Sequence, residues 1–350
     1  MRTEVKRAVL HLSKWLGLFY VARALTRRDL RILCYHNTTA DSEHRHLPKL
    51  FIRASTLEKR LRYLRQHDFP VISLNEAVSG LQAGTLPERA TVITIDDGWY
   101  GTYRHAWPLL RLFNLPATVY VTSYYVAVQK PVFDVAIRYM FSLTRRLRVD
   151  LTGLGLPGIA IADLANAAER NGVIDEIVQW GNNESDESTR DELARQLGDR
   201  LGVDYQTIVT TRTISLMTTG ELRAMADAGI DVQSHTHRHD FPTDGVTAAR
   251  ELDANRAAVE PVVGKRLEHF CYPSGIWSEQ HWSYLRAAGF KSATTCDPGF
   301  NDRQTPLLAL KRFLDGENIA QVEFEAEVSG YTEILRRARR LLRAKLGGPN

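Results

Sequence analysis

Six short runs of apolar or β-branched residues, separated by helical segments, constrain the fold of this chain more than any other feature. The runs span residues 30–35, 91–95, 117–121, 230–233, 268–272 and 291–295. Each run is followed by polar, glycine or proline residues, and such short apolar runs are typical of strands that are buried on both faces. Strands of this kind occur in parallel sheets. The sequence therefore predicts an α/β fold, a parallel sheet or barrel with helices outside it.

The segments between the runs carry helix-start signals. Three capping-box patterns are Ser55 with Glu58, Ser73 with Glu76, and Thr218 with Glu221. In parallel α/β folds the functional groups lie at the carboxyl ends of the strands. The residues that directly follow each run are therefore the candidates for a functional site.

Residues 127–213 interrupt the alternation of strands and helices. Their helical patterns span 135–147, 161–169 and 191–201. They show little strand signal, so we expect an inserted helical subdomain that divides the barrel into residues 29–126 and 214–325. An insertion after a strand end is expected to fold over the mouth of an active site at that end.

Both ends of the chain are basic. Residues 1–28 hold seven Lys or Arg against one acid and residues 332–346 hold six against one, so the ends carry +11 and the remainder −7 of the net charge of +4. A basic groove through the middle of the chain is therefore not expected, and neither is a nucleic-acid partner.

Apolar residues recur at helical spacing within both ends. This spacing predicts a basic amphipathic helix over residues 1–28 and another over residues 326–350. Each helix either packs its apolar stripe on the domain or associates peripherally with a membrane surface. Residues 9–25 contain His11, Lys14 and Arg23 and are too short to span a bilayer, so we expect neither a spanning helix nor a cleaved signal.

The three cysteines, Cys34, Cys271 and Cys296, lie far apart and outside any CxxC spacing. They support neither a disulfide framework nor a zinc–thiolate finger. We therefore expect a reducing compartment, the cytoplasm, with the inner face of the membrane as a peripheral location.

Two adjacent carboxylates, Asp96 and Asp97, follow the run over residues 91–95 and precede Gly98. Two ionised carboxylates repel each other, so the pair is costly unless a cation lies beside it. The alternative is an Asx turn without a function.

A histidine cluster follows the run over residues 230–233. His235 and His239 are four residues apart and would share a face if the segment turned into a helix, whereas His237 would point away. Together with Asp97 they make a two-histidine, one-carboxylate set that leaves coordination positions open for water or substrate. Thr236 stands where a zincin has its glutamate base, so the base must come from elsewhere, and Asp96 is well placed.

These motifs resemble those of the polysaccharide deacetylases, carbohydrate esterase family 4 with the NodB-homology fold. Residues 94–98 (TIDDG) resemble the first family motif, residues 234–239 (SHTHRH) the second, and residues 270–275 (FCYPSG) the third in its F-x-Y-P-x-G form. The similarity spans about residues 30–125 and 213–315 and includes His36 after the first run.

The resemblance implies a distorted (β/α) barrel in which Asp97, His235 and His239 hold one divalent metal and Asp96 is the general base. Zinc is the expected ion, with cobalt, nickel and manganese as alternatives. The third motif implies a substrate and oxyanion site at Tyr272, Pro273, Ser274 and Gly275, with a backbone N–H near Ser274 facing the oxyanion.

This sequence departs from the family pattern at two places. Cys271 stands where many relatives have an arginine that pairs with the catalytic aspartate, and Arg312, after a run over residues 307–310 that resembles a late strand, is the expected substitute. The late Leu-x-His motif that supplies the general acid is not visible, which makes His36 the candidate acid.

The expected activity is metal-dependent removal of an N-acetyl group from an N-acetylhexosamine-containing polysaccharide or lipid-linked saccharide. Three alternatives remain at this point: a deformylase or deacylase of another amino sugar, a two-histidine, one-carboxylate iron enzyme, and a non-catalytic sugar-binding relative.

Overall fold

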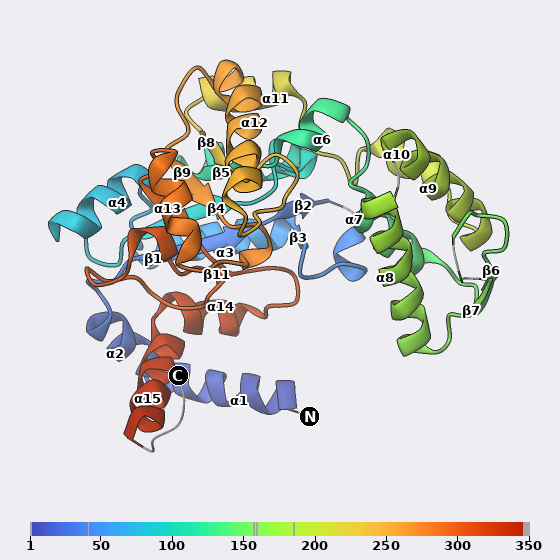
Figure 1. The fold of residues 1–350 in the computed structure, drawn as a ribbon. Coiled ribbons are helices and arrows are strands. Elements are labelled where there is room, and N and C mark those ends of the chain that lie inside the picture. Colours follow the sequence, from blue (N-terminus) through green and yellow to red (C-terminus); the bar gives the residue numbers. More distant parts are fainter. Residues whose placement is uncertain (1, 41, 157, 159, 185, 346–350) are drawn as a thin grey trace.

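A curled sheet of parallel strands forms the centre of the molecule (Figure 1). The computed structural model describes residues 2–40, 42–156, 158, 160–184 and 186–345. The seven strands are β1 (Arg31–Tyr35), β4 (Thr91–Ile95), β5 (Thr118–Val121), β8 (Asp231–Ser234), β9 (His269–Cys271), β10 (Ser292–Thr294) and β11 (Phe313–Leu314). Their spatial order is β10-β9-β8-β5-β4-β1-β11, and all neighbours are parallel.

The two edges of this sheet approach each other. Thr294 of β10 forms a parallel bridge with Leu310, three residues before β11, so the sheet closes into a distorted barrel. This confirms the predicted fold class, and the first six strands lie within two residues of the predicted runs. The expected late strand over residues 307–310 is wrong: residues 307–309 form a 3₁₀ turn, and only Leu310 joins the sheet.

Helices cover the outside of the barrel (Figure 1). They are α3 (Ala54–Gln66), α4 (Leu74–Ala83), α5 (Trp107–Leu112), α11 (Thr219–Asp227), α12 (Gly245–Val263), α13 (Gln280–Ala287) and α14 (Gln321–Val328). The capping boxes at Ser73 and Thr218 are present, each with both reciprocal hydrogen bonds. The box expected at Ser55 is not formed, because α3 already begins at Ala54 and Ser55 lies within its first turn. A separate pair of short parallel strands, β2 (Asn37–Thr39) and β3 (Phe51–Arg53), follows β1.

A mainly helical lobe is inserted in the chain after β5 and before β8, and most of it lies at the right of Figure 1. Its elements are α6 (Ser123–Val128), α7 (Phe133–Leu143), β6 (Arg148–Asp150), β7 (Ile161–Asp163), α8 (Ala167–Glu184), α9 (Glu187–Leu201) and α10 (Tyr205–Thr211). The helix expected over residues 161–169 is wrong in its first part, because residues 161–163 pair with β6 in an antiparallel hairpin. Apart from β6, β7 and the connecting loops, the lobe consists of helices.

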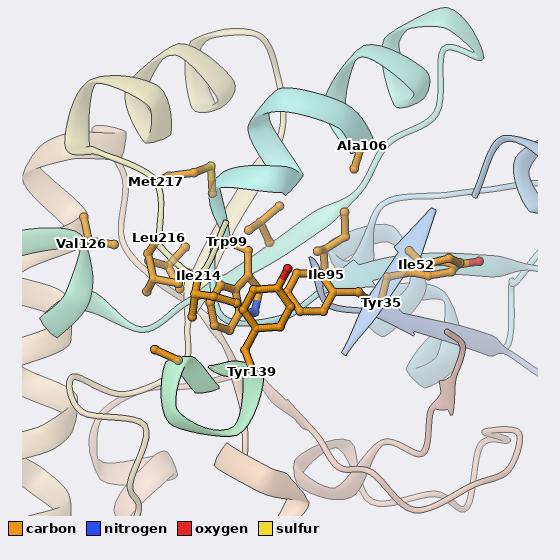
Figure 2. Packing of buried hydrophobic residues seen from close by; sticks show 14 of the residues in the cluster. Tyr35, Ile52, Ile95, Trp99, Ala106, Val126, Tyr139, Ile214, Leu216 and Met217 are labelled. Carbon is orange, nitrogen blue, oxygen red and sulfur yellow. The ribbon is translucent and has the colours of Figure 1, made fainter. Parts of the chain in front are cut away.

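The lobe and the barrel share one hydrophobic core. Figure 2 shows where they meet: Tyr139 of α7 lies beside Ile95, Trp99 and Tyr35 at the carboxyl ends of the barrel strands. Ile214 and Leu216, on the segment that returns to the barrel, complete this cluster. The packing anchors the lobe at the end of the sheet where the acidic and histidine motifs lie.

The terminal helices lie together below the barrel in Figure 1, next to α14. They are α1 (Arg2–Trp15), α2 (Leu18–Leu25) and α15 (Tyr331–Lys345). The single helix expected within residues 1–28 is broken in two at Gly17, whose φ of 76° lies in the left-handed region that a helix interior does not use. In the described part of the chain, no helix combines the length and the apolar character that crossing a bilayer requires.

Candidate active site

Asp97, His235 and His239 meet at the carboxyl ends of β4 and β8. Nε2 of His235 lies 3.2 Å from Oδ1 of Asp97, and Nε2 of His239 lies 3.5 Å from the same oxygen. The three candidate ligand atoms all lie within 4.8 Å of one another. The structure therefore brings together the three residues that the sequence singled out for metal binding.

The two histidines converge by a different route from the expected helical one. Residues 235–239, directly after β8, do not form a helix. Instead, Thr236 and His239 both have a left-handed φ, 63° and 61°. These two left-handed residues fold the loop back so that both imidazoles reach Asp97. Between them, His237 turns away, as expected, and its Nδ1 lies 2.9 Å from the hydroxyl of Ser123.

Neighbouring groups fix the orientation of these ligands. The indole N–H of Trp99 donates to Oδ2 of Asp97 at 2.7 Å, which leaves Oδ1 facing the histidines. The carbonyl of Cys271 lies 2.8 Å from Nδ1 of His235 and selects the tautomer whose Nε2 carries a free lone pair. Partners of this kind hold metal-binding side chains in position in known metal sites.

The donor set fits a divalent metal ion. Ligand atoms about 2 Å from a common tetrahedral ion lie about 3.3 Å from one another, close to the separations seen around Oδ1 of Asp97. This oxygen is buried and has no hydrogen-bond partner among the described residues. A buried carboxylate oxygen without a donor, faced by two imidazole nitrogens, is what a metal site requires.

Asp96 lies beside this set and is held by Arg312. The guanidinium donates to both carboxylate oxygens, at 2.7 and 2.8 Å, and both side chains are buried. Burial alone would raise the pKa of Asp96, but the charge and hydrogen bonds of Arg312 lower it to about 2. Asp96 is thus a buried carboxylate that stays ionised.

Arg312 is itself fixed on several sides. Its Nε donates to the carbonyl of Thr295 at 2.8 Å, and a further N–H reaches the hydroxyl of Thr94 at 3.2 Å. The residue lies directly before β11, so the sheet edge next to β1 delivers it to the barrel interior. Arg312 therefore pairs with Asp96, as expected for a substitute for the third-motif arginine that this chain lacks.

All three cysteines gather around this ion pair. The thiols of Cys34 and Cys271 lie 3.4 and 3.5 Å from Oδ2 of Asp96, and Cys296 lies 3.9 Å from Arg312. Burial raises the pKa of the Cys34 and Cys296 thiols, which keeps them neutral. This arrangement could not be predicted from the sequence, because the cysteines are separated by long stretches of chain.

His36 follows β1 and lines the same cavity as Asp96. Its Nε2 lies 3.9 Å from Oδ2 of Asp96, and its side chain is 20% exposed. His36 therefore lies near Asp96, beyond hydrogen-bond distance, and is open to a molecule bound in the cavity.

The third motif forms a tight turn after β9. The turn spans residues 273–275, and both Ser274 and Gly275 have a left-handed φ, 55° and 68°. A Cβ at Gly275 would lie 2.4 Å from Cβ of Cys296, so the close approach of the two strand ends requires glycine. Ser274 and Tyr272 line the cavity, whereas Pro273 is buried. The hydroxyl of Tyr272 is bound to the carbonyl of Leu308 at 2.9 Å and supports the turn.

A cavity of about 850 Å³ opens above these residues. The barrel supplies one wall and the lobe supplies the other, through Tyr124, Asp134, Glu187 and Arg190 among others. The lobe therefore narrows the mouth of the cavity.

Polar groups of the lobe are linked across this wall. The hydroxyl of Tyr124 donates to Glu187 at 2.9 Å, and Arg190 donates to the same carboxylate at 2.8 Å. Asp134, at the start of α7, is close enough to His239 to interact with it, and burial raises the pKa of the Asp134 carboxyl. These residues could not be identified from the sequence, because single acids and aromatics inside helical segments carry no motif.

Comparisons with known proteins point to one family. The model of the polysaccharide deacetylase family matches residues 189–293, which include the histidine loop and the third motif but not Asp96 and Asp97. Two relatives are the poly-β-1,6-N-acetyl-D-glucosamine N-deacetylases of Escherichia coli (strain K12), 28% identical over 86 residues, and of Staphylococcus aureus (strain MSSA476), 26% identical over 85 residues. Each match covers 24% of this chain, and it covers 12% and 29% of the respective relative.

Solved structures share the fold over most of the chain. A deacetylase of Streptococcus pyogenes, PplD in complex with acetate, aligns over 86% of this chain and 98% of its own with a TM-score of 0.57 at 14% identity. IcaB from Ammonifex degensii aligns over 86% and 97% with a TM-score of 0.53 at 18% identity. These alignments confirm the fold, and together with the sequence match they confirm the resemblance to the polysaccharide deacetylases.

Proposed function

We propose that this relative of the polysaccharide deacetylases is a metal-dependent hydrolase that removes the acetyl group from an N-acetylhexosamine unit of a saccharide. One observation carries the proposal: a metal-binding set, Asp97, His235 and His239, lies next to an ionised carboxylate, Asp96, at the base of one cavity. Amide hydrolysis needs an activated water, a base for its proton and a stabilised oxyanion, and this arrangement offers a place for each.

The ion proposed for this site is zinc, with cobalt, nickel or manganese as alternatives. Two imidazoles and one carboxylate are the ligand types of catalytic zinc sites that keep coordination positions open. When bound, such an ion supplies a Lewis acid that brings the pKa of water to about 7 and polarises an amide carbonyl.

Asp96 is the proposed general base. It lines the cavity next to Asp97, and its carboxylate accepts the proton of the attacking water. Arg312 is proposed as a positioning residue: its two hydrogen bonds hold the plane of the Asp96 carboxylate and keep that group ionised. This assignment extends the deacetylase pattern to a chain that has Cys271 in place of the arginine of the third motif.

His36 is the proposed general acid. Its ring reaches the cavity on the Asp96 side, from where an imidazolium can give a proton to the leaving amine. The turn at Ser274 is the proposed source of a backbone N–H for the oxyanion.

The lining of the cavity supports a saccharide substrate. Hydroxyl, carboxylate and guanidinium groups of Tyr124, Glu187 and Arg190 offer hydrogen bonds to sugar hydroxyls, and the aromatic rings of Tyr124 and Tyr125 offer apolar surface. Because the relatives named above act on poly-β-1,6-N-acetyl-D-glucosamine, we propose an N-acetylglucosamine-containing exopolysaccharide or its lipid-linked precursor as the substrate. Three free cysteines support a reducing location, the cytoplasm or the inner face of the membrane.

The parallel barrel argues against an iron oxygenase, since such enzymes place the same ligands on antiparallel jelly rolls.

A test of the proposal uses purified protein with zinc or cobalt and a panel of N-acetylated and N-formylated oligosaccharides. Released acetate is the expected product, and Asp96→Asn is the matched inactive control.

Three results would contradict this function. Release of formate alone would favour the deformylase alternative. Saccharide binding without turnover at any metal loading would favour the non-catalytic relative. Activity that Asp96→Asn leaves unchanged would place the reaction elsewhere.

A further inference from the structure

Large apolar side chains are exposed mainly at the terminal helices. In the described part of the chain, eighteen such side chains are exposed, and twelve of them lie in α1, α2, the Leu16 linker and α15. The nine near the N-terminus are Val5, Val9, Leu12, Trp15, Leu16, Leu18, Tyr20, Val21 and Leu25. The three in α15 are Leu335, Leu341 and Leu342. We call the nine N-terminal side chains the terminal-helix face. Exposed apolar side chains that are concentrated on one part of a surface indicate an interaction site, whereas singly scattered ones are ordinary.

The exposed apolar residues of α1 form one stripe. Val5, Val9, Leu12 and Trp15 are separated by four, three and three positions, the spacing of a single helix face. Leu10, on another face, is buried against α14 and Phe19 of α2. The helix thus turns its long apolar stripe to the outside.

Polar contacts accompany the packing of Leu10 on α14. Lys6 and Arg7 pair with Glu323 at 2.7 and 3.1 Å, and Lys14 pairs with Glu325 at 2.5 Å. Both glutamates lie on α14, which packs against α1. The basic side chains remain 39–60% exposed, but all three lie on the side of α1 that pairs with α14. The orientation leaves the apolar stripe free for another partner.

Basic side chains accompany the exposed face on α2. Arg23, Arg27 and Arg89 line a shallow cavity of about 450 Å³ next to Tyr20, together with the acids Asp68 and Glu88. Arg27 pairs with Glu88 at 3.0 Å, while Arg23 and the exposed Arg28 make no ion pair within the described residues. The guanidinium groups suit the phosphates of lipid headgroups, and the neighbouring apolar face suits the acyl chains.

We propose that the terminal-helix face docks the protein onto an anionic lipid bilayer. Trp15 is 81% and Tyr20 72% exposed, and both side chains have the apolar body and polar tip that suit the boundary between headgroups and acyl chains. The helices lie on the surface and do not cross it, in agreement with the absence of a spanning helix in the described part. This inference goes beyond the proposed hydrolysis and does not depend on it.

The experiment uses the full chain in sedimentation with large vesicles. Vesicles of phosphatidylcholine with phosphatidylglycerol are compared with vesicles of phosphatidylcholine alone, at low and high salt. Binding is expected with the anionic vesicles, with an affinity that falls as salt rises, because part of the attraction is between charges.

Exposed positions allow substitutions that leave the fold intact. Leu12→Glu with Trp15→Glu should lower the affinity for anionic vesicles at least tenfold, and Arg23→Glu with Arg28→Glu should lower it and flatten the salt dependence. Leu112→Glu and Val246→Glu are matched controls, since both residues are similarly exposed, at 69% and 62%, but lie on other helices. The controls should bind like the parent chain, and circular dichroism should be the same for all variants.

Two results would overturn the proposal. The first is vesicle binding that is absent, or equal for the variants and the controls. The second is a parent chain that is dimeric without lipid and becomes monomeric with Leu12→Glu and Trp15→Glu, which would make the face an interface between two copies. Hydrolysis of a small soluble saccharide reports on the proposed function separately, because these residues lie outside the active-site cavity.

Discussion

At the carboxyl end of the barrel, charged side chains are buried, whereas at the terminal helices large apolar side chains are exposed. Asp96 and Arg312 are almost completely enclosed, while Trp15 is 81% exposed. The buried pair costs folding free energy because its charges lose hydration, whereas the exposed apolar side chains forgo the stabilisation that burial would give. The buried pair offsets its cost by two direct hydrogen bonds, but the terminal-helix face has no covering group in the described structure. The difference separates charges that find their partners within the chain from an apolar surface that no described residue covers.

The largest expected effect comes from the buried site. Replacing Asp97, His235 or His239 by alanine should remove the metal, whereas Asp96→Asn should retain it and lower turnover by about two or more orders of magnitude. Metal content by mass spectrometry and acetate release measure the two effects separately. His237→Ala, in the same loop, is the control and should keep the metal. Metal loss in Asp96→Asn but not in Asp97→Asn would reverse the roles of the two aspartates.

Arg312→Met tests the buried ion pair directly. It leaves the buried Asp96 without its partner, so the free energy of unfolding should fall by about 3–5 kcal/mol in chemical denaturation. Arg312 lowers the pKa of Asp96, so its removal raises that pKa, and the base then becomes ionised only at higher pH. The acidic limb of the pH–rate profile should therefore move upward in pH.

Lys311→Met is the matched control for this substitution, because Lys311 is the neighbouring cation and makes no bond to Asp96. Its stability and pH profile should equal those of the parent. A pH profile of Arg312→Met that superimposes on the parent profile would show that Arg312 does not tune the base.

Trp99→Phe tests whether the indole N–H of Trp99 orients Asp97 in the candidate metal site. The substitution keeps the ring in the core but removes the N–H that holds Oδ2 of Asp97. Loss of such a supporting hydrogen bond typically lowers metal affinity by about 10–100-fold. Competition with a chromophoric chelator measures the affinity, and an unchanged value would mean that packing alone orients Asp97.

Glu187→Gln tests whether the lobe contributes to substrate choice. The change weakens the contacts of Glu187 with Tyr124 and Arg190 at the cavity wall. A several-fold rise in KM for long saccharides, with kcat and metal content unchanged, is expected, because the wall lies away from the reacting amide. An equal effect on short and long saccharides would argue against a contact with the distal sugars.

Glu323→Gln should have the smallest effect. It removes the charge that Lys6 and Arg7 share, but both cations are substantially exposed, so the loss of stability should stay within about 1 kcal/mol. Thermal unfolding measures this change. A larger loss would show that the ion pairs, and not the contact of Leu10 with α14, hold α1 in place.

The fold and the core of the site could be predicted because their signals are local. Apolar runs specify strands wherever both faces are buried, and the residues after Ile95 and Gln233 mark the ends of two of them. Parallel strands place these ends at one edge of the sheet, which is why Asp97, His235 and His239 come together. The helical geometry expected for the histidine pair was wrong, because left-handed φ values at Thr236 and His239 are not evident from residue type.

Sequence by itself determined the parallel α/β architecture, the acidic and histidine motifs, and the basic amphipathic character of both ends, since each depends on neighbouring residues and their periodicity. Only the tertiary structure decided what each side chain faces. It brought Arg312, Cys34 and Cys271 to Asp96 from separate parts of the chain, set Trp99 against Asp97, and packed Leu10 of α1 against α14 so that the apolar stripe of α1 faces outward. These contacts join residues far apart in the chain, and their energies depend on burial and distance, which exist only once the chain has folded.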